Sequence, residues 1–190
     1  MKRRRNSQEI PAEIQALLNS RDIEYIAQGI FLADSIGIDG DTLISWMQRY
    51  APVFINVFGY NLTGMDELAK ETILLLLEYF SDSDFFQNVQ VIDLYGMKLK
   101  QLPDEIGNLE NLRELYLSSN NLTELPDSIG KLGALQRLIV PNNKLTKLPD
   151  SIGNIAFLEV LSLTQNNLTE LPDSIGKIRW LADCLYPTTT

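Results

Sequence analysis

The decapeptide LTELPDSIGK occurs twice in this chain, at Leu122–Lys131 and at Leu168–Lys177. An altered copy, LTKLPDSIGN, lies between them at Leu145–Asn154, and a more distant copy, LKQLPDEIGN, precedes them at Leu99–Asn108. Successive copies begin 23 residues apart. A fixed period of this length indicates one structural unit that is stacked several times, and such an array offers an extended exposed face and rarely a deep catalytic pocket.

The apolar positions of each unit predict one short strand. In the unit that begins at Leu112, Leu115 and Leu117 are separated by one residue, so their side chains point to the same face. This register starts at Val89 and gives four full units and a fragment that begins at Leu181. No unit can bury its apolar residues alone, so the strands are expected to stack into one parallel sheet. The expected strand centres are Ile92, Leu115, Leu138 and Leu161.

Proline, aspartate and glycine recur together in each unit. Pro126 and its counterparts cannot continue a hydrogen-bonded ladder, so each is expected to begin a tight turn or a short helix. Asp127 follows at once, where a carboxylate can cap free backbone N–H groups, and we interpret it as structural instead of as a metal ligand or an acid–base group. Gly130 is suited to a left-handed helix end. The counterparts of Asp127 are Asp104, Asp150 and Asp173.

An asparagine follows each predicted strand from the second unit onward. Asn120, Asn143 and Asn166 occupy this position, where their side chains can satisfy buried backbone groups of adjacent turns. In the first unit the position is taken by Met97. The row of asparagines is therefore expected to begin at Asn120.

The pattern LPxxIGxLxxLxxLxLxxNxL resembles the consensus of the 23-residue class of leucine-rich repeats. That class is shared by bacterial repeat proteins and by Ras-suppressor-like and Scribble-like scaffolds. The resemblance covers residues 89–183. It implies an α/β fold, a curved leucine-rich repeat solenoid with a short parallel sheet on its concave face and an asparagine ladder. It also implies protein–protein interaction as the default activity.

The register predicts which side chains project from the concave face, because they alternate with the buried strand residues. Several of them are apolar or aromatic on a face that is expected to be solvated, and tyrosines beside aliphatic residues are the composition of an interface centre. The alternative is scattered surface hydrophobics, which are common. We expect a protein partner to bind here. The expected contact residues are Val91, Asp93, Tyr95, Glu114, Tyr116, Arg137, Ile139 and Val160.

The first half of the chain lacks the 23-residue pattern and predicts helices. Residues 9–18, 20–36, 41–50 and 65–80 fit helices, whereas 51–60 fits either a strand or a helix. Met65–Phe80 is apolar nearly all round and is expected to be buried on both sides. A solenoid must cover the open edge of its first unit, so we interpret residues 1–88 as a helical N-terminal cap and 89–190 as the repeats. The alternative is an independent helical domain with its own ligand.

The charge and composition of the chain exclude some classes of partner. The net charge is −9, so nucleic acid and anionic membranes are not expected partners. The basic run Lys2–Arg5 is the exception, and we interpret it as a solvated end. No apolar run approaches the roughly 20 residues that cross a bilayer and no signal peptide is visible, so a cytoplasmic location is expected. The single cysteine, Cys184, excludes an internal disulfide and is expected in a buried strand position.

Enzymatic activity is not expected. The chain has no histidine and its sole cysteine is predicted to be buried, so the usual pairs of general base and nucleophile are missing. No phosphate-binding loop motif is present, and no catalytic residue, cofactor or metal site is predicted. One alternative is that the repeats are the targeting arm of an enzyme or effector with its chemistry in the helical half. Another is a structural protein that forms homo-oligomers through its C-terminal end, where a strand edge is expected to be exposed.

Overall fold

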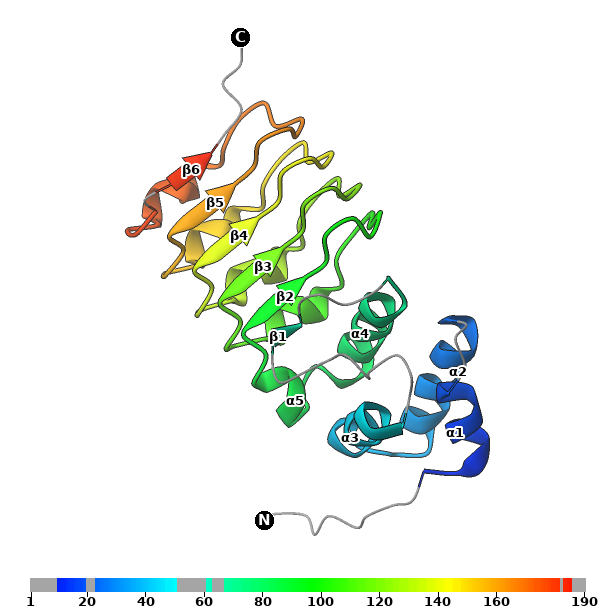
Figure 1. Cartoon of the computed structure of the whole chain (residues 1–190). Helices are drawn as coiled ribbons and strands as arrows, with labels where there is room; N and C mark the ends of the chain where they lie inside the picture. The colour runs from blue at the N-terminus through cyan, green and yellow to red at the C-terminus, as the bar shows by residue number, and fades with distance from the viewer. Residues whose placement is uncertain (1–9, 20–22, 51–60, 63–66, 182, 186–190) are drawn as a thin grey trace, which may run out of the picture.

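The computed structural model describes residues 10–19, 23–50, 61–62, 67–181 and 183–185. Within these ranges, one parallel sheet runs through the repeats and helices gather at its N-terminal end (Figure 1). The strands are β1 (Asn61–Leu62), β2 (Val91–Asp93), β3 (Glu114–Tyr116), β4 (Arg137–Ile139), β5 (Val160–Ser162) and β6 (Asp183–Leu185). The α-helices are α1 (Ala12–Leu18), α2 (Ile23–Ser35), α3 (Gly40–Tyr50), α4 (Glu67–Phe80) and α5 (Asp84–Gln87). The 3-10 helices are η2 (Asp104–Asn108), η3 (Asp127–Lys131), η4 (Asp150–Asn154) and η5 (Asp173–Lys177).

The strands pair in the register that the repeat predicts. Val91 pairs with Glu114 and Ile92 pairs with Leu115, and the same offset continues through β6 in sequence order. The central residues of β2 and β3 are fully buried, whereas their flanking residues are partly exposed. The sheet therefore has one face in the core and one open face, and the predicted parallel solenoid is confirmed.

The 3-10 helices cover the buried face of the sheet. Each begins directly after a proline, as predicted, and that proline is the N-cap residue. No side-chain hydrogen bond caps these helices, so the predicted capping role of Asp127 and its counterparts is wrong. The aspartate lies one position later, inside the first turn, where its charge still faces the positive end of a short helix.

The recurring glycine is needed for close packing and not for a left-handed conformation. The described non-glycine residues with positive φ are Lys98, Ser119, Asn142 and Gln165, and Gly130 is not among the glycines with positive φ. A Cβ atom on Gly130 would lie 2.3 Å from the carbonyl oxygen of Ser151 in the next unit. The predicted left-handed helix end is therefore wrong. Neighbouring 3-10 helices approach so closely that only hydrogen fits at this position.

The asparagine ladder is present and begins at Asn120, as predicted. The side-chain amide of Asn143 donates to the carbonyl of Leu117 in the preceding unit at 2.9 Å and to Val140 at 3.2 Å. Its side-chain oxygen accepts from the backbone N–H of Leu122 at 3.0 Å. Asn120 and Asn166 make the equivalent bonds. Each asparagine satisfies buried backbone groups of two units, which locks neighbouring units in register.

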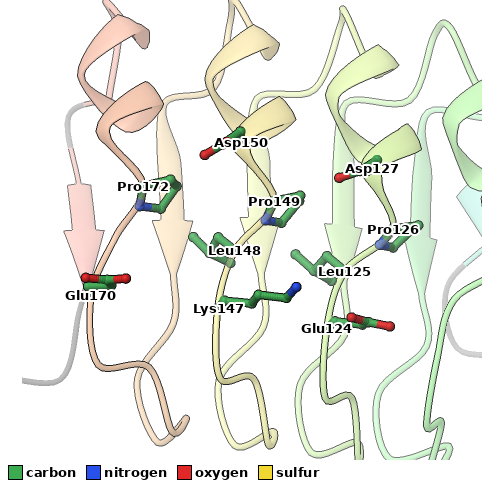
Figure 2. A pocket seen from close by; sticks show the side chains of 10 residues that line it. All are labelled: Glu124, Leu125, Pro126, Asp127, Lys147, Leu148, Pro149, Asp150, Glu170 and Pro172. Carbon is green, nitrogen blue, oxygen red and sulfur yellow. The ribbon is translucent and has the colours of Figure 1, made fainter.

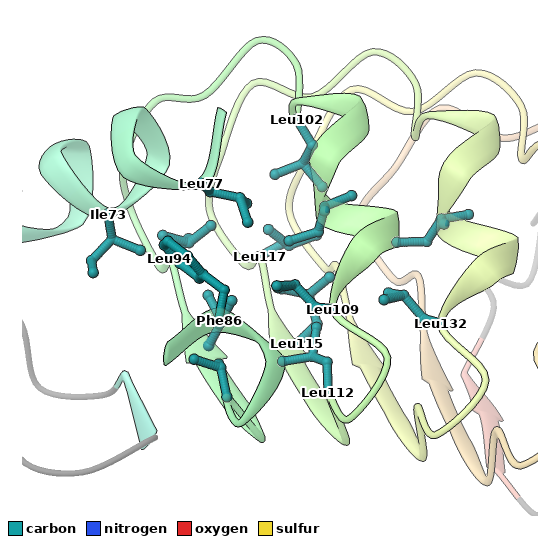
Figure 3. Close-up of a cluster of buried hydrophobic side chains, with 14 of the residues drawn as sticks. Ile73, Leu77, Phe86, Leu94, Leu102, Leu109, Leu112, Leu115, Leu117 and Leu132 are labelled. Atoms are coloured by element: carbon teal, nitrogen blue, oxygen red, sulfur yellow. The ribbon is translucent and has the colours of Figure 1, made fainter. Parts of the chain in front are cut away.

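Helix α4 covers the open end of the repeats. Ile73 and Leu77 project from α4 toward Leu94 and the side chains behind it, and Phe86 of α5 lies below them (Figure 3). Ile73, Leu77, Phe86 and Leu94 are each no more than 1% exposed and belong to the same continuous core as the repeat leucines. α1 packs on α2 and α2 packs on α4, so the helices form a layered N-terminal cap.

The first half differs from the sequence prediction in β1, in α5 and in the burial of α4. β1 and α5 were not predicted, and β1 adds a strand to the sheet ahead of the first repeat. α4 is not buried on both sides, because Leu74 and Leu75 are only partly buried and Glu78 is exposed. The ambiguous segment 51–60 lies outside the described residues.

Candidate functional site

The open face of the sheet carries the predicted contact residues in two aligned rows. Val91, Glu114, Arg137 and Val160 follow one another across β2 to β5 through strand pairing. Asp93, Tyr116, Ile139 and Ser162 form the second row in the same way. Paired residues of neighbouring strands lie about 4.7–4.9 Å apart. All eight predicted contact residues therefore lie on or beside this face, with Tyr95 two residues beyond Asp93.

Exposure varies along this face. Tyr95 and Arg137 are exposed, with 59% of Tyr95 accessible, whereas Tyr116, Ile139 and Val160 are partly buried. On β5 the second row carries Ser162, which is only 8% exposed, and the row continues to Leu185 on β6. The described aromatic and aliphatic side chains of the open face thus extend from β2 to Val160 on β5.

Tyr116 is held in place by its neighbours in the first row. Its hydroxyl donates a hydrogen bond to Oε2 of Glu114 at 2.5 Å. This bond, together with partial burial and the negative charge of Glu114, raises the pKa of Tyr116 above its ordinary value, and Arg137 opposes the rise. The phenol ring therefore has a fixed polar partner at its tip and an aliphatic neighbour, Ile139, on the next strand.

A second fixed feature follows β2. Oδ1 of Asp93 accepts a hydrogen bond from the backbone N–H of Tyr95 at 2.9 Å. A short turn of this kind, in which an aspartate binds the backbone two residues on, fixes the local chain direction. The exposed Tyr95 thus follows two residues after Asp93, which pairs with Tyr116.

A different hollow, which the sequence interpretation missed, lies on the flank of the solenoid. It encloses about 620 Å³ and is formed where the LPD segments of three successive units lie side by side (Figure 2). Its lining residues are Glu124, Leu125, Pro126, Asp127, Lys147, Leu148, Pro149, Asp150, Glu170 and Pro172. The repeat itself was the available signal, because residues at equivalent positions of a solenoid form continuous rows.

The described residues form neither a cluster that would hold a metal ion nor a helix that would span a membrane. Within the described ranges, no three histidine, cysteine, aspartate or glutamate side chains are grouped so that they would hold a metal ion. No helix in the same part of the chain has the length and apolar character needed to span a bilayer. Cys184 lies in β6, and the burial of its side chain lies outside what the structure describes.

Comparison with known proteins adds independent support for the repeat assignment. Two family profiles, both described as leucine-rich repeats, match residues 87–145 and residues 157–178. Comparison with curated protein sequences gave no match.

Solved structures with a similar fold include a leucine-rich repeat protein of Leptospira interrogans, at 34% identity and a TM-score of 0.55, over 75% of this chain and 39% of that one. The BIR2 ectodomain of Arabidopsis thaliana is 28% identical, with a TM-score of 0.46 over 50% of this chain and 52% of that chain. The plant peptide hormone receptor RGFR1, in complex with RGF2, is 30% identical, with a TM-score of 0.45 over 62% of this chain and 17% of that one.

This chain spans 39% of the length of the Leptospira protein. The profiles, the parallel strand register and the asparagine ladder agree on the nature of the repeats. The repeats of this chain, residues 87–145 and 157–178, are therefore leucine-rich repeats.

Proposed function

We propose that this chain is a non-catalytic protein-interaction module whose partner binds the open, concave face of the sheet. The presence of leucine-rich repeats supports protein interaction as the general role. The finer part of the proposal, the binding face, rests on one observation. Strand pairing places Tyr116 beside Ile139, Tyr95 follows two residues beyond the end of β2, and all three side chains are at least partly exposed.

The side chain of Tyr116 is held in one position before binding, and this favours affinity. An interface loses affinity whenever long side chains must be immobilised, by roughly 0.5–1.5 kcal/mol for each one. The hydrogen bond from Tyr116 to Glu114 fixes the phenol before any partner arrives. Truncation of an aromatic anchor at the centre of an interface typically costs about 2 kcal/mol or more of binding free energy.

The face also carries charges that would select a partner. Asp93 and Glu114 lie on β2 and β3, and Arg137 lies on β4 beside Glu114. Charged groups around an apolar centre act mainly on specificity and on the association rate. A partner that fits this face would offer an apolar or aromatic group over Tyr116 and Ile139, with polar groups at its border.

The test is truncation of Tyr116. A partner is first recovered by affinity purification with the intact chain, and its purified form is then titrated against Tyr116→Ala by calorimetry. We expect affinity to fall at least about tenfold, since roughly 1.4 kcal/mol corresponds to a factor of ten. The melting temperature should change little, because substitutions away from the core usually alter stability by about 0.5 kcal/mol.

Tyr25→Ala is the matched control, because Tyr25 is a 51% exposed tyrosine on α2 that lies away from the sheet. It should bind as the intact chain does. Unchanged binding by Tyr116→Ala together with a lowered melting temperature would show that Tyr116 supports the fold and that the concave face is not the site.

A further inference from the structure

A second hollow lies at the junction between α4 and the first repeat. It encloses about 510 Å³, and Leu74, Leu75 and Pro103 provide its apolar lining. Leu74 and Leu75 pack against the edge of the core but are only partly buried, so part of each side chain remains on the exposed side of α4. A long α-helix that caps a solenoid would ordinarily present polar residues on such a side. The two leucines therefore leave an apolar surface open at this position.

The polar lining of this junction hollow is almost entirely anionic. Glu71 and Glu78 of α4 lie on one side, Glu105 of η2 lies on the other, and Gln101 is the remaining polar residue. No lysine or arginine is among the described residues that line it. A concave surface that carries one sign of charge raises the local concentration of ligands of the opposite sign.

The junction hollow continues along the flank of the solenoid. Gln101 and Pro103 also line a neighbouring hollow of about 280 Å³, which in turn shares Glu124 and Pro126 with the hollow shown in Figure 2. Across the described lining of all three hollows, Lys147 is the only cation. The flank thus offers a continuous, mainly acidic path that begins at the apolar surface of α4.

We propose that the junction hollow binds an extended, basic segment of a partner protein. An aliphatic side chain of the segment lies over Leu74 and Leu75, and flanking lysine or arginine side chains reach Glu71, Glu78 and Glu105. Lysine and arginine fit both parts of the hollow, because their aliphatic stems pack on apolar surface while their charged ends remain at its rim. Charge complementarity selects this occupant over an acidic or a neutral apolar one. None of the residues proposed to bind on the concave face lines this hollow, so this site is additional to the proposed function.

The probe is a nine-residue peptide that alternates arginine with leucine and carries a fluorescent label. A second peptide alternates arginine with serine and so keeps the charge without the apolar side chains. Binding to the full chain is followed by fluorescence anisotropy at about 50 and 200 mM salt, because exposed charge pairs weaken as salt rises. We expect the arginine–leucine peptide to bind at least about tenfold more tightly than the arginine–serine peptide. Equal affinity of the two peptides would overturn the role of Leu74 and Leu75.

The position of binding is tested with charge reversal. Glu71→Lys combined with Glu78→Lys should weaken the arginine–leucine peptide at least about tenfold, whereas a matched pair away from the flank, Glu110→Lys with Glu159→Lys, should weaken it less than about twofold. Glu110 and Glu159 are exposed and line none of the three hollows. Equal losses from both pairs would show attraction to the net charge alone and would overturn the site. Thermal melts confirm that each variant is folded.

Two further variants separate this site from other occupants. Tyr116→Ala should bind the peptide as the intact chain does. Loss of binding there, with binding kept in the α4 variant, would overturn the junction site and leave the concave face standing. Replacement of Lys2, Arg3, Arg4 and Arg5 by serine should leave the affinity unchanged. A marked rise in the affinity for the peptide would show that this chain's own basic run competes for the hollow. That result would overturn the proposal that a separate partner binds there.

Discussion

The side-chain amide of Asn108 donates a hydrogen bond to the hydroxyl of Ser81 at 2.9 Å, and this bond joins the first repeat to the residue that follows α4. Gln87 adds a bond to the carbonyl of Asn108 at 3.0 Å and another to the carbonyl of Ser81 at 3.0 Å. Asn111 donates to the carbonyl of Gln87 at 2.7 Å. These bonds and the shared apolar core join the helical half to the repeats. We therefore expect the two halves to unfold together.

The first prediction follows from that junction. Leu77→Ala should lower the free energy of unfolding of the whole chain by about 2–5 kcal/mol, because Leu77 is fully buried between α4 and the repeats. Trp46 lies in the helical half and Trp180 in the last repeat, so variants with Trp46→Phe or Trp180→Phe report each half separately in urea. The urea midpoints reported by Trp46 and by Trp180 should shift by the same amount.

Leu74→Ala is the control, because its side chain is only partly buried, and it should cost markedly less. A midpoint that shifts for Trp46 but not for Trp180 would mean that the two halves unfold independently.

The second prediction concerns the asparagine ladder. Asn143→Ala should destabilise the chain by about 2–4 kcal/mol, because it leaves the buried N–H of Leu122 without its partner and removes one of the two hydrogen bonds to the carbonyl of Leu117, the other coming from Asn120. Asn121→Ala removes a longer, exposed bond of 3.3 Å to the carbonyl of Lys98 and should cost less than about 1 kcal/mol. Urea denaturation measures both. Similar losses from the two variants would argue against the ladder as a source of stability.

The third prediction concerns the close approach of neighbouring 3-10 helices. Gly130→Ala should destabilise the repeats by about 1–3 kcal/mol, since its Cβ would lie 2.3 Å from the carbonyl oxygen of Ser151 and must push the units apart. Gly176 occupies the same position in the last unit and has no atom within 4 Å of such a Cβ. Gly176→Ala should therefore be nearly neutral in thermal denaturation. A neutral Gly130→Ala would show that the units separate without strain.

The fourth prediction concerns the titration of Tyr116. Its pKa is raised in the folded chain, so the unfolded chain loses this proton first as the pH rises. The contribution of Tyr116 to stability is therefore complete below its ordinary pKa of 10.0 and is lost as the pH rises above that value toward the folded pKa. Absorbance of tyrosinate, taken as the difference between the intact chain and Tyr116→Phe, reports the folded pKa.

Glu114→Gln should lower that pKa toward 10.0, because the charge of Glu114 and the hydrogen bond it accepts are the main cause of the rise. Glu110→Gln, a matched loss of charge in the loop that precedes β3, should leave it unchanged. A titration that Glu114→Gln does not move would mean that the contact with Glu114 is absent in solution.

The strand register of the repeats could be predicted from the sequence, whereas β1 and the role of Gly130 could not, and the difference has a physical cause. Alternation within each unit fixes which residues face the core, so the pairing of Val91 with Glu114 and of Tyr116 with Ile139 follows from a single register. β1 has two residues and lies outside the repeat, so no period indicates it. The role of Gly130 depends on a distance to Ser151 in the next unit, which no pattern within one unit reveals.

In the candidate site, too, the positions of the residues could be predicted but the contacts between their side chains could not. The positions of the eight contact residues on the open face follow from the register alone. The hydrogen bond between Tyr116 and Glu114 does not, because residues two apart on a strand share a face but their rotamers depend on local packing. The apolar surface formed by Leu74 and Leu75 was missed because the composition of α4 suggested burial on both sides.

The ladder of Asn120, Asn143 and Asn166 has a consequence for how the chain can change in length. Each asparagine binds only its own unit and the preceding one. The glycine of one unit packs in the same way on the serine of the next, as Gly107 on Ser128, Gly130 on Ser151 and Gly153 on Ser174. A duplicated block of 23 residues would therefore bring its own complete set of connections to both neighbours. The width of the open face can grow or shrink by one strand at a time, by duplication or deletion of one block, without redesign of the core.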